Sequence, residues 1–505
     1  MTIPWLTILG VVPLIGALAL VFIKGNAARL VGLAFAVITA AIAIALLVQF
    51  QFDGGMQFTE QVAWIPAIGA WYSLGLDGLG LTLVLLTALL VPFVMIAGWD
   101  DAEVTGRGST ASYFALVLML QGLSMFVFTA TDVLLFYLFF EATLIPMYFL
   151  IGRMGLGGRR GRAAVKFLLF SLAGGLIMLA AVIGLYAVSA AAGNPTYLLE
   201  ELAALNIDGE IGRWLFVGFF IAFAVKAPMV PVHSWLPDAA EEGHAGSSAL
   251  LVGVLDKIGT FGMIRFCLGL FPEASTWATP VVLVLALISI LWGAIAALGQ
   301  RNLMRLIAFT SVSHFGFIVL GIWAFTTTSM SGSIFYMLNH GFSTAVMFLV
   351  AGYLVRRRGT AEIAAFGGVQ TVAPVLAGVF LVGGLSTISL PGMSSFVSEF
   401  MVLAGTFSRF PVYGAIAALG LVLAAAYILV MYKRTMTGPV PEPVRARVTD
   451  LTARERFAVA PLIVLILALG FFPKPMLDVI NPASQDTLQA VGVVDPEPQI
   501  VEGSN

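Results

Sequence analysis

Apolar stretches of about twenty residues recur along the whole chain, with short polar segments between them. A helix of this length crosses the roughly 30 Å of hydrocarbon in a bilayer. Period-two alternation of apolar and polar residues is absent, so a β-barrel is not expected. The pattern predicts about fourteen transmembrane helices. The predicted spans are residues 3–23, 28–50, 74–98, 112–131, 132–152, 166–190, 211–230, 246–270, 277–298, 303–325, 333–355, 371–406, 411–433 and 456–472.

Two of these spans are interrupted. In residues 224–240, AVKAPMVPVHSWLPDAA, the lysine Lys226 is followed by Pro228, Pro231 and Pro237, through which a helix cannot continue. The twelfth span is too long for one straight helix and contains SLPG at 389–392, so we expect two half-helices there. Unwound backbone at membrane depth needs protein or water around it, and transporters place such breaks at their ion sites.

The two breaks also indicate how the chain is organised. They fall in the seventh and twelfth spans, which are five spans apart. Because five is an odd number, a unit of five helices that repeats would start on the opposite side of the membrane, so the two units would run in opposite directions. We therefore expect helices 1–3 in residues 1–110, a first repeat in 111–270, an inverted second repeat in 271–435, and the last helix with a short, acidic tail in 436–505.

Composition agrees with an all-α polytopic membrane protein. The 505 residues are 60% apolar and 10% charged, whereas a soluble protein carries about 25% charge. Mean hydropathy is +1.01. The single cysteine, Cys267, excludes an intrachain disulfide and a thiolate-bound metal cluster. The N-terminus lacks a basic segment and a small-residue cleavage site, so we expect a retained first span.

Basic residues predict the orientation of the chain. Of the 25 lysines and arginines, all but six lie beside the loops that follow odd-numbered spans, including Arg107. Two of the six, Lys226 and Lys257, lie within spans, and four lie on the opposite side: Arg213, Arg265, Arg409 and Lys474. Because positive loops stay in the cytoplasm, we expect both termini on the non-cytoplasmic side.

Ionisable residues within the apolar spans are the candidate functional residues. They are Glu141, Lys226, Lys257, His314, His340 and, after the SLPG break, Glu399. None of them can face lipid without a large cost, so they must face the protein interior, where they pair or meet water. Burial disfavours the charged forms of Glu, Lys and His, which brings their titration towards neutral pH. A row of such groups can pass on a proton.

Each of these residues also has a purely structural interpretation. A single buried histidine is commonly a hydrogen-bonded core residue, which applies to His314 and His340 taken alone. Glu141 and Lys226 could form a static ion pair between helices. Asp256 precedes Lys257, but adjacent helical residues point about 100° apart and do not face each other. At the start of their spans, Lys166 is expected to extend towards the membrane surface, and Asp132 is expected to cap a helix.

Sequence motifs for cofactor binding are absent. The chain contains no GxGxxG between a strand and a helix, no GxxxxGK[ST], no HExxH and no CxxC. We therefore expect no nucleotide, flavin, haem or metal on this chain, and no nucleic-acid partner. Any redox cofactor in the same process would belong to other chains.

Five segments together resemble the antiporter-like subunits of respiratory complex I, the proton-pumping NADH:quinone oxidoreductase. They are FYLFFEATLIPMYFLIG at 136–152, AFAVKAPMVPVHSWLPDA at 222–239, GVLDKIGTFGMIRF at 253–266, SVSHFGF at 311–317 and NHGFSTAVMFLVAG at 339–352. The resemblance covers about residues 70–435. The wider family includes large subunits of Mrp-type sodium/proton antiporters and of membrane-bound hydrogenases.

The resemblance implies a role for each candidate residue. Glu141 and Lys226 match the glutamate and lysine of the first half-channel, Lys257 matches the central lysine, and the histidines match His314 and His340. The exit residue is lysine in two subunit types and glutamate in the third, which Glu399 matches. Asp256 departs from the family, where we expect an apolar residue.

The implied mechanism starts with proton uptake from the cytoplasm to Lys257. Glu141 sets the charge state of Lys226, and loss of their contact would make Lys226 release its proton onward. The proton would then move through His314 and His340, with waters, to Glu399. Quinone reduction elsewhere in the complex would supply the energy.

The resemblance also implies the surroundings of the chain. NADH, FMN, iron–sulfur clusters and quinone would be bound by partner subunits. The chain would lie in a bacterial plasma membrane beside other complex I membrane subunits, flanked by the L and N types.

Three alternatives stay open. An Mrp-type cation/proton antiporter subunit would transport without redox coupling, although we expect lysine at position 399 there. A scaffold would use the ionisable residues only to join helices. A free-standing channel is disfavoured, because no continuous polar stripe crosses any one span.

Overall fold

The structure is a computed structural model that describes residues 3–53, 55–104, 106 and 108–496. Arg107 and the last part of the predicted tail, 497–505, lie outside the described residues. The first half contains α1 (Trp5–Phe22), α2 (Asn26–Gln49), β1 (Gln57–Ile65), η1 (Pro66–Ile68), β2 (Ala70–Leu76), α3 (Gly78–Ala97), α4 (Asp101–Val104), α5 (Thr110–Thr129), α6 (Val133–Ala142), α7 (Leu144–Gly152), α8 (Arg160–Ala191), α9 (Leu199–Ala204), α10 (Gly209–Lys226) and α11 (Trp235–Glu242). The second half contains α12 (Ala245–Leu250), η2 (Leu251–Leu255), α13 (Lys257–Gly262), η3 (Met263–Leu268), α14 (Pro272–Leu298), α15 (Leu303–Trp323), α16 (Thr327–Arg358), η4 (Ile363–Ala365), α17 (Val369–Val372), α18 (Pro374–Thr387), α19 (Ser394–Arg409), α20 (Pro411–Met436), α21 (Glu442–Arg447), α22 (Ala453–Phe471) and α23 (Lys474–Val491).

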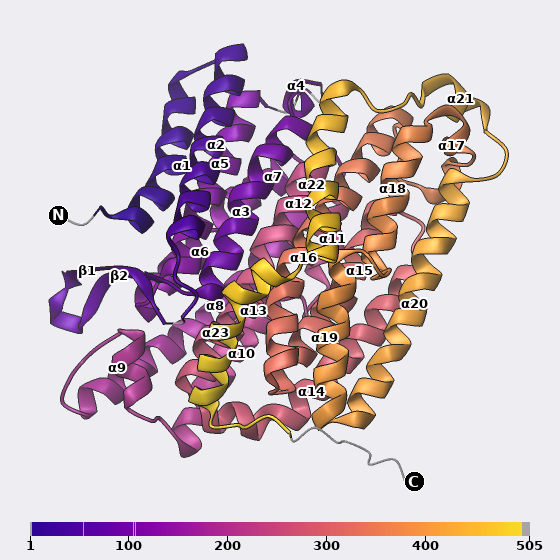
Figure 1. The fold of residues 1–505 in the computed structure, drawn as a ribbon. Helices are drawn as coiled ribbons and strands as arrows, with labels where there is room; N and C mark the ends of the chain where they lie inside the picture. Colours follow the sequence, from indigo (N-terminus) through magenta and orange to yellow (C-terminus); the bar gives the residue numbers. More distant parts are fainter. Residues whose placement is uncertain (1–2, 54, 105, 107, 497–505) are drawn as a thin grey trace, which may run out of the picture.

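The long helices form one bundle (Figure 1). Within the described residues, ten helical spans are long and apolar enough to cross a membrane, and α22 with α23, bent by 71°, would make an eleventh. The other predicted spans coincide with α10, which carries three charged residues, with the run from α12 to η3, and with α18 and α19. The helical membrane fold is confirmed, whereas the count of fourteen stays a prediction.

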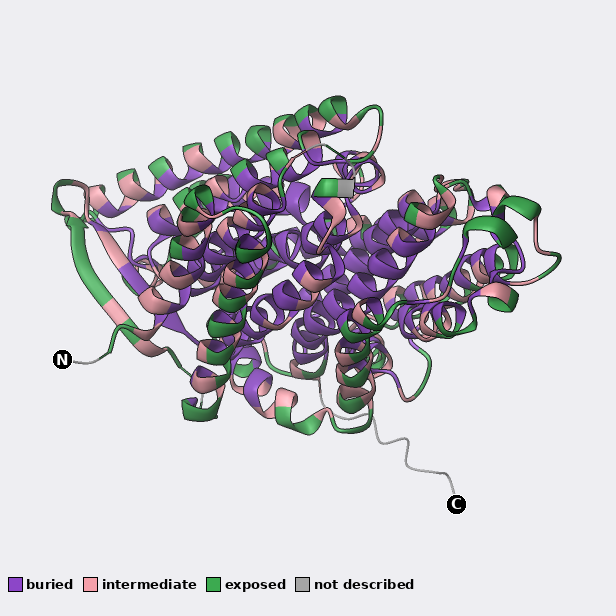
Figure 2. Cartoon of the chain, turned by 90° about the horizontal axis from the view of Figure 1, so that it is seen from above, coloured by how far each residue is buried: buried purple, intermediate pink, exposed green. Residues whose placement is uncertain are grey.

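The central helices of the bundle are α15 and α16, which are buried along their apolar length. Helix α16 packs against α3, α12, α15, α18, α19 and α22. Exposed residues lie mainly around the outside of the bundle, and buried residues make up its interior (Figure 2). The outer helices α1, α2, α8, α14 and α20 keep large apolar side chains exposed, as lipid-facing helices do.

Both predicted helix breaks are present. Helix α10 ends at Lys226 and α11 begins at Trp235. The indole nitrogen of Trp235 donates a hydrogen bond to the carbonyl oxygen of Val225 at 3.0 Å. The amide of Met229 donates to the carbonyl oxygen of Ala224, also at 3.0 Å. These bonds satisfy carbonyls that the interrupted helix would leave without partners inside the membrane.

The second break separates α18, which ends at Thr387, from α19, which begins at Ser394. Ser389 lies between them with φ +54, a left-handed conformation that non-glycine residues rarely adopt. From α16, the side-chain amide of Asn339 donates to the carbonyl oxygen of Ser394 at 3.0 Å. The turn is therefore held by the central helix of the bundle.

The span that carries Lys257 has an irregular backbone that the sequence pattern did not predict. Two π-helical segments, η2 and η3, flank α13, and Lys257 is the first residue of α13. A π-helical turn inserts an extra residue into the helix, and such turns occur frequently at functional sites.

Two further elements were not predicted. Strands β1 and β2 form an antiparallel hairpin, and Asp132 accepts a hydrogen bond from the backbone amide of Trp71 at 2.9 Å while it caps α6. Residues after Pro473, predicted as a polar tail, form helix α23. Its buried face, which includes Val479 and Ile480, packs against α3 and α16.

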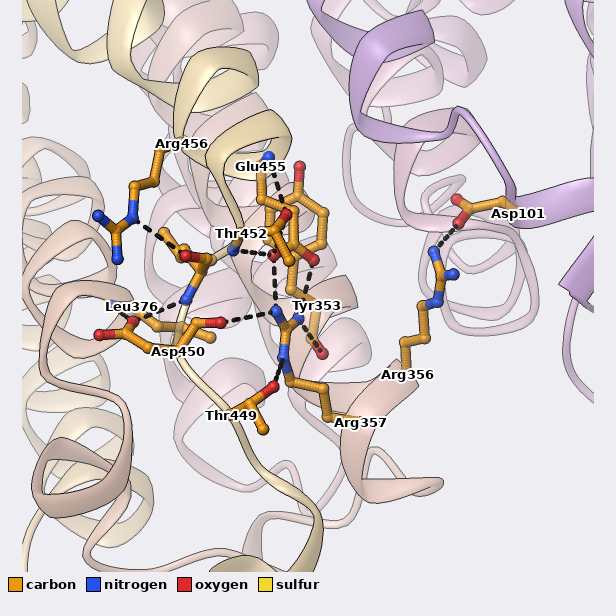
Figure 3. A network of polar contacts seen from close by, with 11 residues as sticks. Asp101, Tyr353, Arg356, Arg357, Leu376, Thr449, Asp450, Thr452, Glu455 and Arg456 are labelled. Atoms are coloured by element: carbon orange, nitrogen blue, oxygen red, sulfur yellow. Dashed lines mark hydrogen bonds and ion pairs between the residues drawn. The ribbon is translucent and has the colours of Figure 1, made fainter. Parts of the chain in front are cut away.

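Polar contacts fasten one end of α16 to the segment that leads into α22 (Figure 3). Arg357, in the last turn of α16, donates two hydrogen bonds to the carboxylate of Glu455, at 2.6 and 2.9 Å. Asp450 accepts hydrogen bonds from the backbone amides of Val375 and Leu376, at 3.0 and 2.8 Å. These amides belong to the first turn of α18 and would otherwise lack partners.

Candidate functional site

The predicted site residues lie on helices that meet inside the bundle. Lys226 is the last residue of α10, and Lys257 is the first residue of α13. His314 lies in α15 and His340 in α16. These four residues are all buried, with exposed fractions of 3% or less. Glu399, in α19, is likewise buried at 2%, whereas Glu141, at the end of α6, is half-buried.

Lys257 and His340 are in direct contact. The lysine Nζ atom lies 2.7 Å from Nδ1 of His340 and donates to the carbonyl oxygen of Val252 at 2.6 Å. It also lies 5.1 Å from the ring centre of Phe315. The rings of His314 and His340 follow with centroids 5.3 Å apart. Lys257 on α13, His340 on α16 and His314 on α15 therefore lie next to one another, with a hydrogen-bond contact between the first two.

Tyr336 links the histidines to Glu399. Its hydroxyl lies 2.5 Å from Nδ1 of His314 and donates to the carboxylate of Glu399 at 3.2 Å. The hydroxyl of Ser389 donates to the same carboxylate oxygen. Tyr427 lies 3.4 Å from the other ring nitrogen of His314. Glu399 is thus held by a residue of α16 and by the left-handed turn of the second break.

The half of the site that contains Glu141 and Lys226 is less connected. Among the described residues, Lys226 Nζ and Glu141 Oε1 have no hydrogen-bond partner, and no ion pair joins the two side chains. The ammonium group instead lies 4.9 Å from the ring centre of Phe140 and 5.8 Å from that of Phe167. The static ion pair that the sequence left open is therefore not formed in this structure.

Glu141 reaches its position because α8 has a glycine there. A Cβ atom on Gly175 would lie 1.7 Å from Glu141 Oε1. No side chain larger than hydrogen fits between the carboxylate and the α8 backbone without a shift. Gly175 thus gives the carboxylate its space between α6 and α8.

Sequence reasoning missed Tyr336, Ser389 and Tyr427. One signal was available for Tyr336, which precedes His340 by four residues and so lies on the same face of α16. Ser389 belongs to the SLPG motif that marked the break. Tyr427 lies in the apolar part of α20, and no sequence pattern distinguishes it from core aromatic residues.

The chain matches a family of membrane proteins over more than half of its length. The family described as "NADH:quinone oxidoreductase/Mrp antiporter, TM" matches residues 130–428. NADH-quinone oxidoreductase subunit M of Mycobacterium tuberculosis is 48% identical, covering 99% of this chain and 96% of the relative. NADH-ubiquinone oxidoreductase chain 4 of Arabidopsis thaliana is 35% identical, covering 94% of this chain and 95% of the relative.

Solved structures share the fold. A chain of respiratory complex I from Thermus thermophilus with bound NADH superposes with a TM-score of 0.88 at 32% identity, covering 97% of this chain and all of that chain. A chain of the Mrp complex from a Dietzia species superposes with a TM-score of 0.84 at 23% identity, over 97% of this chain and 100% of that one, which shows a common fold only. The family resemblance seen in the sequence motifs is confirmed. The chain belongs to the NADH:quinone oxidoreductase/Mrp antiporter family of transmembrane subunits, among the complex I subunits of the M type.

Proposed function

We propose that this chain, as a proton-translocating membrane subunit of an NADH:quinone oxidoreductase, carries protons through Glu141, Lys226, Lys257, His340, His314 and Glu399. Quinone reduction elsewhere in the complex supplies the energy, and this chain carries out no redox step itself. The observation that carries the proposal is the series of buried polar groups from Lys257 to Glu399, joined by hydrogen-bond contacts except between the two histidine rings.

The contacts support proton transfer because each member of the series can hold or release a proton. Lys257 Nζ lies within hydrogen-bond distance of His340, and Tyr336 lies within that distance of both His314 and Glu399. No direct hydrogen bond joins the two histidine rings, whose centroids are 5.3 Å apart, so the proposed step between them uses a bridging water. Tyr336 therefore joins the proposed route as an additional hydroxyl between His314 and Glu399.

The separation of Glu141 from Lys226 favours a contact that forms and breaks during transport over a permanent ion pair that joins helices. In the proposed cycle, contact with Glu141 keeps Lys226 protonated, and separation makes Lys226 release its proton towards Lys257. Ionic groups that only join helices require satisfied partners, because an unpaired buried charge is strongly destabilising. Lys226 Nζ lacks a partner among the described residues, which disfavours the scaffold alternative.

The Mrp-type alternative has less support. The relatives that are 48% and 35% identical are complex I subunits, whereas the Mrp structure is 23% identical. Glu399 also occupies the position where we expect lysine in the Mrp large subunits. Purifying the chain from its native membrane would distinguish the two, since complex I subunits must accompany it if the proposal holds.

The surroundings follow from the same proposal. NADH, FMN, iron–sulfur clusters and quinone belong to partner subunits, and L-type and N-type subunits flank this chain in a bacterial plasma membrane. Both termini lie on the non-cytoplasmic side. The two repeats, 111–270 and 271–435, run in opposite directions, so that each contributes one broken helix to the route.

The test is to replace Glu141 with Gln and Lys226 with Ala in the assembled complex. Both E141Q and K226A are expected to abolish most proton pumping and coupled quinone reduction, measured in inverted membrane vesicles. Lys433, an exposed lysine of α20, provides the control K433A, which is expected to pump like the wild type. Intact pumping by assembled K226A would falsify the carrier role.

A further inference from the structure

Asp256 is a buried acidic side chain that the proposed route does not use. It is 0% exposed, and neither of its carboxylate oxygens has a hydrogen-bond partner among the described residues. Burying a carboxylate without partners is costly unless it binds a proton or lies near positive charge. The presence of a carboxyl group at this buried position therefore requires an explanation other than packing.

The structure excludes a capping role for Asp256. Its backbone is engaged in the helix, because its amide donates to Leu251 and its carbonyl accepts from Gly259. Its side chain, in contrast, accepts no hydrogen bond from the first turn of α13. Asp132, in contrast, is a buried aspartate with a structural role: its two oxygens accept hydrogen bonds from the backbone amides of Leu135 and Trp71, both at 2.9 Å.

Helix geometry places Asp256 between the two lysines. Residues three apart lie on the same face of a helix, so Asp256 shares a face with Gly259. A Cβ atom on Gly259 would lie 2.6 Å from the amide nitrogen of Ala227, which follows Lys226 directly. The face shared by Asp256, which directly precedes α13, and Gly259 therefore packs against the end of α10. Lys257, the next residue, contacts His340.

The charged groups around Asp256 are the proposed proton carriers themselves. Lys257 and Lys226 both interact electrostatically with its carboxylate. Helix α16 contributes His340, in contact with Lys257. Helices α3 and α5 also pack against α13, and their spans contain no acidic or basic residue. Among the described residues, the charged groups that act on the Asp256 carboxylate are thus the two lysines of the proposed route.

We propose that Asp256 is a proton-carrying group that joins Lys226 to Lys257. In the first step an N–H bond of the Lys226 ammonium breaks and an O–H bond forms on the Asp256 carboxylate. In the second step this carboxylic acid donates the proton to the neutral amine of Lys257, and Asp256 becomes a carboxylate again. Neither lysine nitrogen is within hydrogen-bond distance of the carboxylate, so each step uses a bridging water or a change of rotamer.

This inference rests on the proposed function, since it needs Lys226 and Lys257 as carriers. The test uses D256N, D256L and D256E in the assembled complex, with proton pumping and quinone reduction measured across pH. D256N and D256L are expected to lower pumping by about tenfold or more at every pH, the effect of losing a positioned proton carrier. D256E keeps a carboxylate and is expected to retain most pumping, with a shifted pH profile.

The matched control is D132N, which changes another fully buried aspartate and keeps one of the two oxygens that accept backbone hydrogen bonds. It is expected to pump normally once assembled. D256N preserves the shape of the side chain. If D256L does not assemble, D256N alone therefore tests whether Asp256 carries a proton.

Two results would overturn the inference. Wild-type pumping by D256N would show that no proton passes through this residue. Recovery of D256N at lower pH would show that Asp256 only supplies negative charge, because added protons would then replace its effect on the lysines. If K226A is inactive while D256N is normal, only this inference fails, whereas an active K226A removes the proposed route as a whole.

Discussion

The Nζ atom of Lys257 lies 2.7 Å from Nδ1 of His340, and both residues are buried at the centre of the bundle. The contact joins α13, which starts between two π-helical segments, to α16, which the other helices surround. The hydrogen-bonded core histidine that the sequence offered as the alternative is compatible with this contact, so the role of His340 stays a prediction. In the proposed route, His340 is the neighbour to which Lys257 passes its proton.

This contact predicts that H340Q lowers proton pumping by about tenfold, because the amide can accept a hydrogen bond from Lys257 but cannot carry a proton. Pumping is to be measured in inverted membrane vesicles against the amount of assembled complex. Assembly is expected to be normal, since glutamine keeps a polar group near Lys257. If H340Q pumps as well as the wild type, His340 has only a structural role.

Gly175 offers a test of the position of Glu141. In G175A the new Cβ would lie 1.7 Å from the carboxylate oxygen of Glu141, so the carboxylate or one helix must shift. A misplacement of about 1 Å at a transfer site can cost roughly 10²-fold. We expect G175A to assemble and to lose most pumping, as E141Q does. The control is G161A in the same helix, since a Cβ on Gly161 would meet no atom within 4 Å.

Asp450 is expected to stabilise the first half of the broken α18–α19 span. Its carboxylate accepts hydrogen bonds from the first-turn amides of α18. D450A should therefore lower the free energy of unfolding by about 1 kcal/mol or more, measured by thermal unfolding of the purified complex. The control is D208A, since Asp208 precedes α10 without making such a side-chain cap.

The contribution of Asp450 should also depend on pH. Burial alone would raise the pKa of its carboxyl, but the backbone hydrogen bonds of Val375, Leu451 and Leu376 outweigh burial and hold the pKa below the usual value. A lowered pKa in the folded state stabilises the fold above the unfolded pKa of about 3.9. The stability difference between wild type and D450A should shrink as pH falls through the lowered pKa. A difference that does not change with pH would contradict this.

The sequence by itself determined the membrane fold, the two broken helices and the identity of the ionisable residues. These features are local, because twenty apolar residues must form a helix in lipid and prolines must interrupt one. Lys226, Lys257 and Glu399 stand out in the sequence for the same reason, since a charged side chain in an apolar span is costly wherever the span packs.

Only the tertiary structure decided which of these residues touch. Tyr336 became part of the site because α15, α16 and α19 pack together, and Asp256 was left without a partner because α13 lies against the end of α10. Hairpin β1–β2 and helix α23 were likewise missed, since tertiary packing decides whether such short, half-polar segments fold. Hydrogen-bond partners depend on the approach of helices far apart in the chain, and no local pattern of residues encodes that distance.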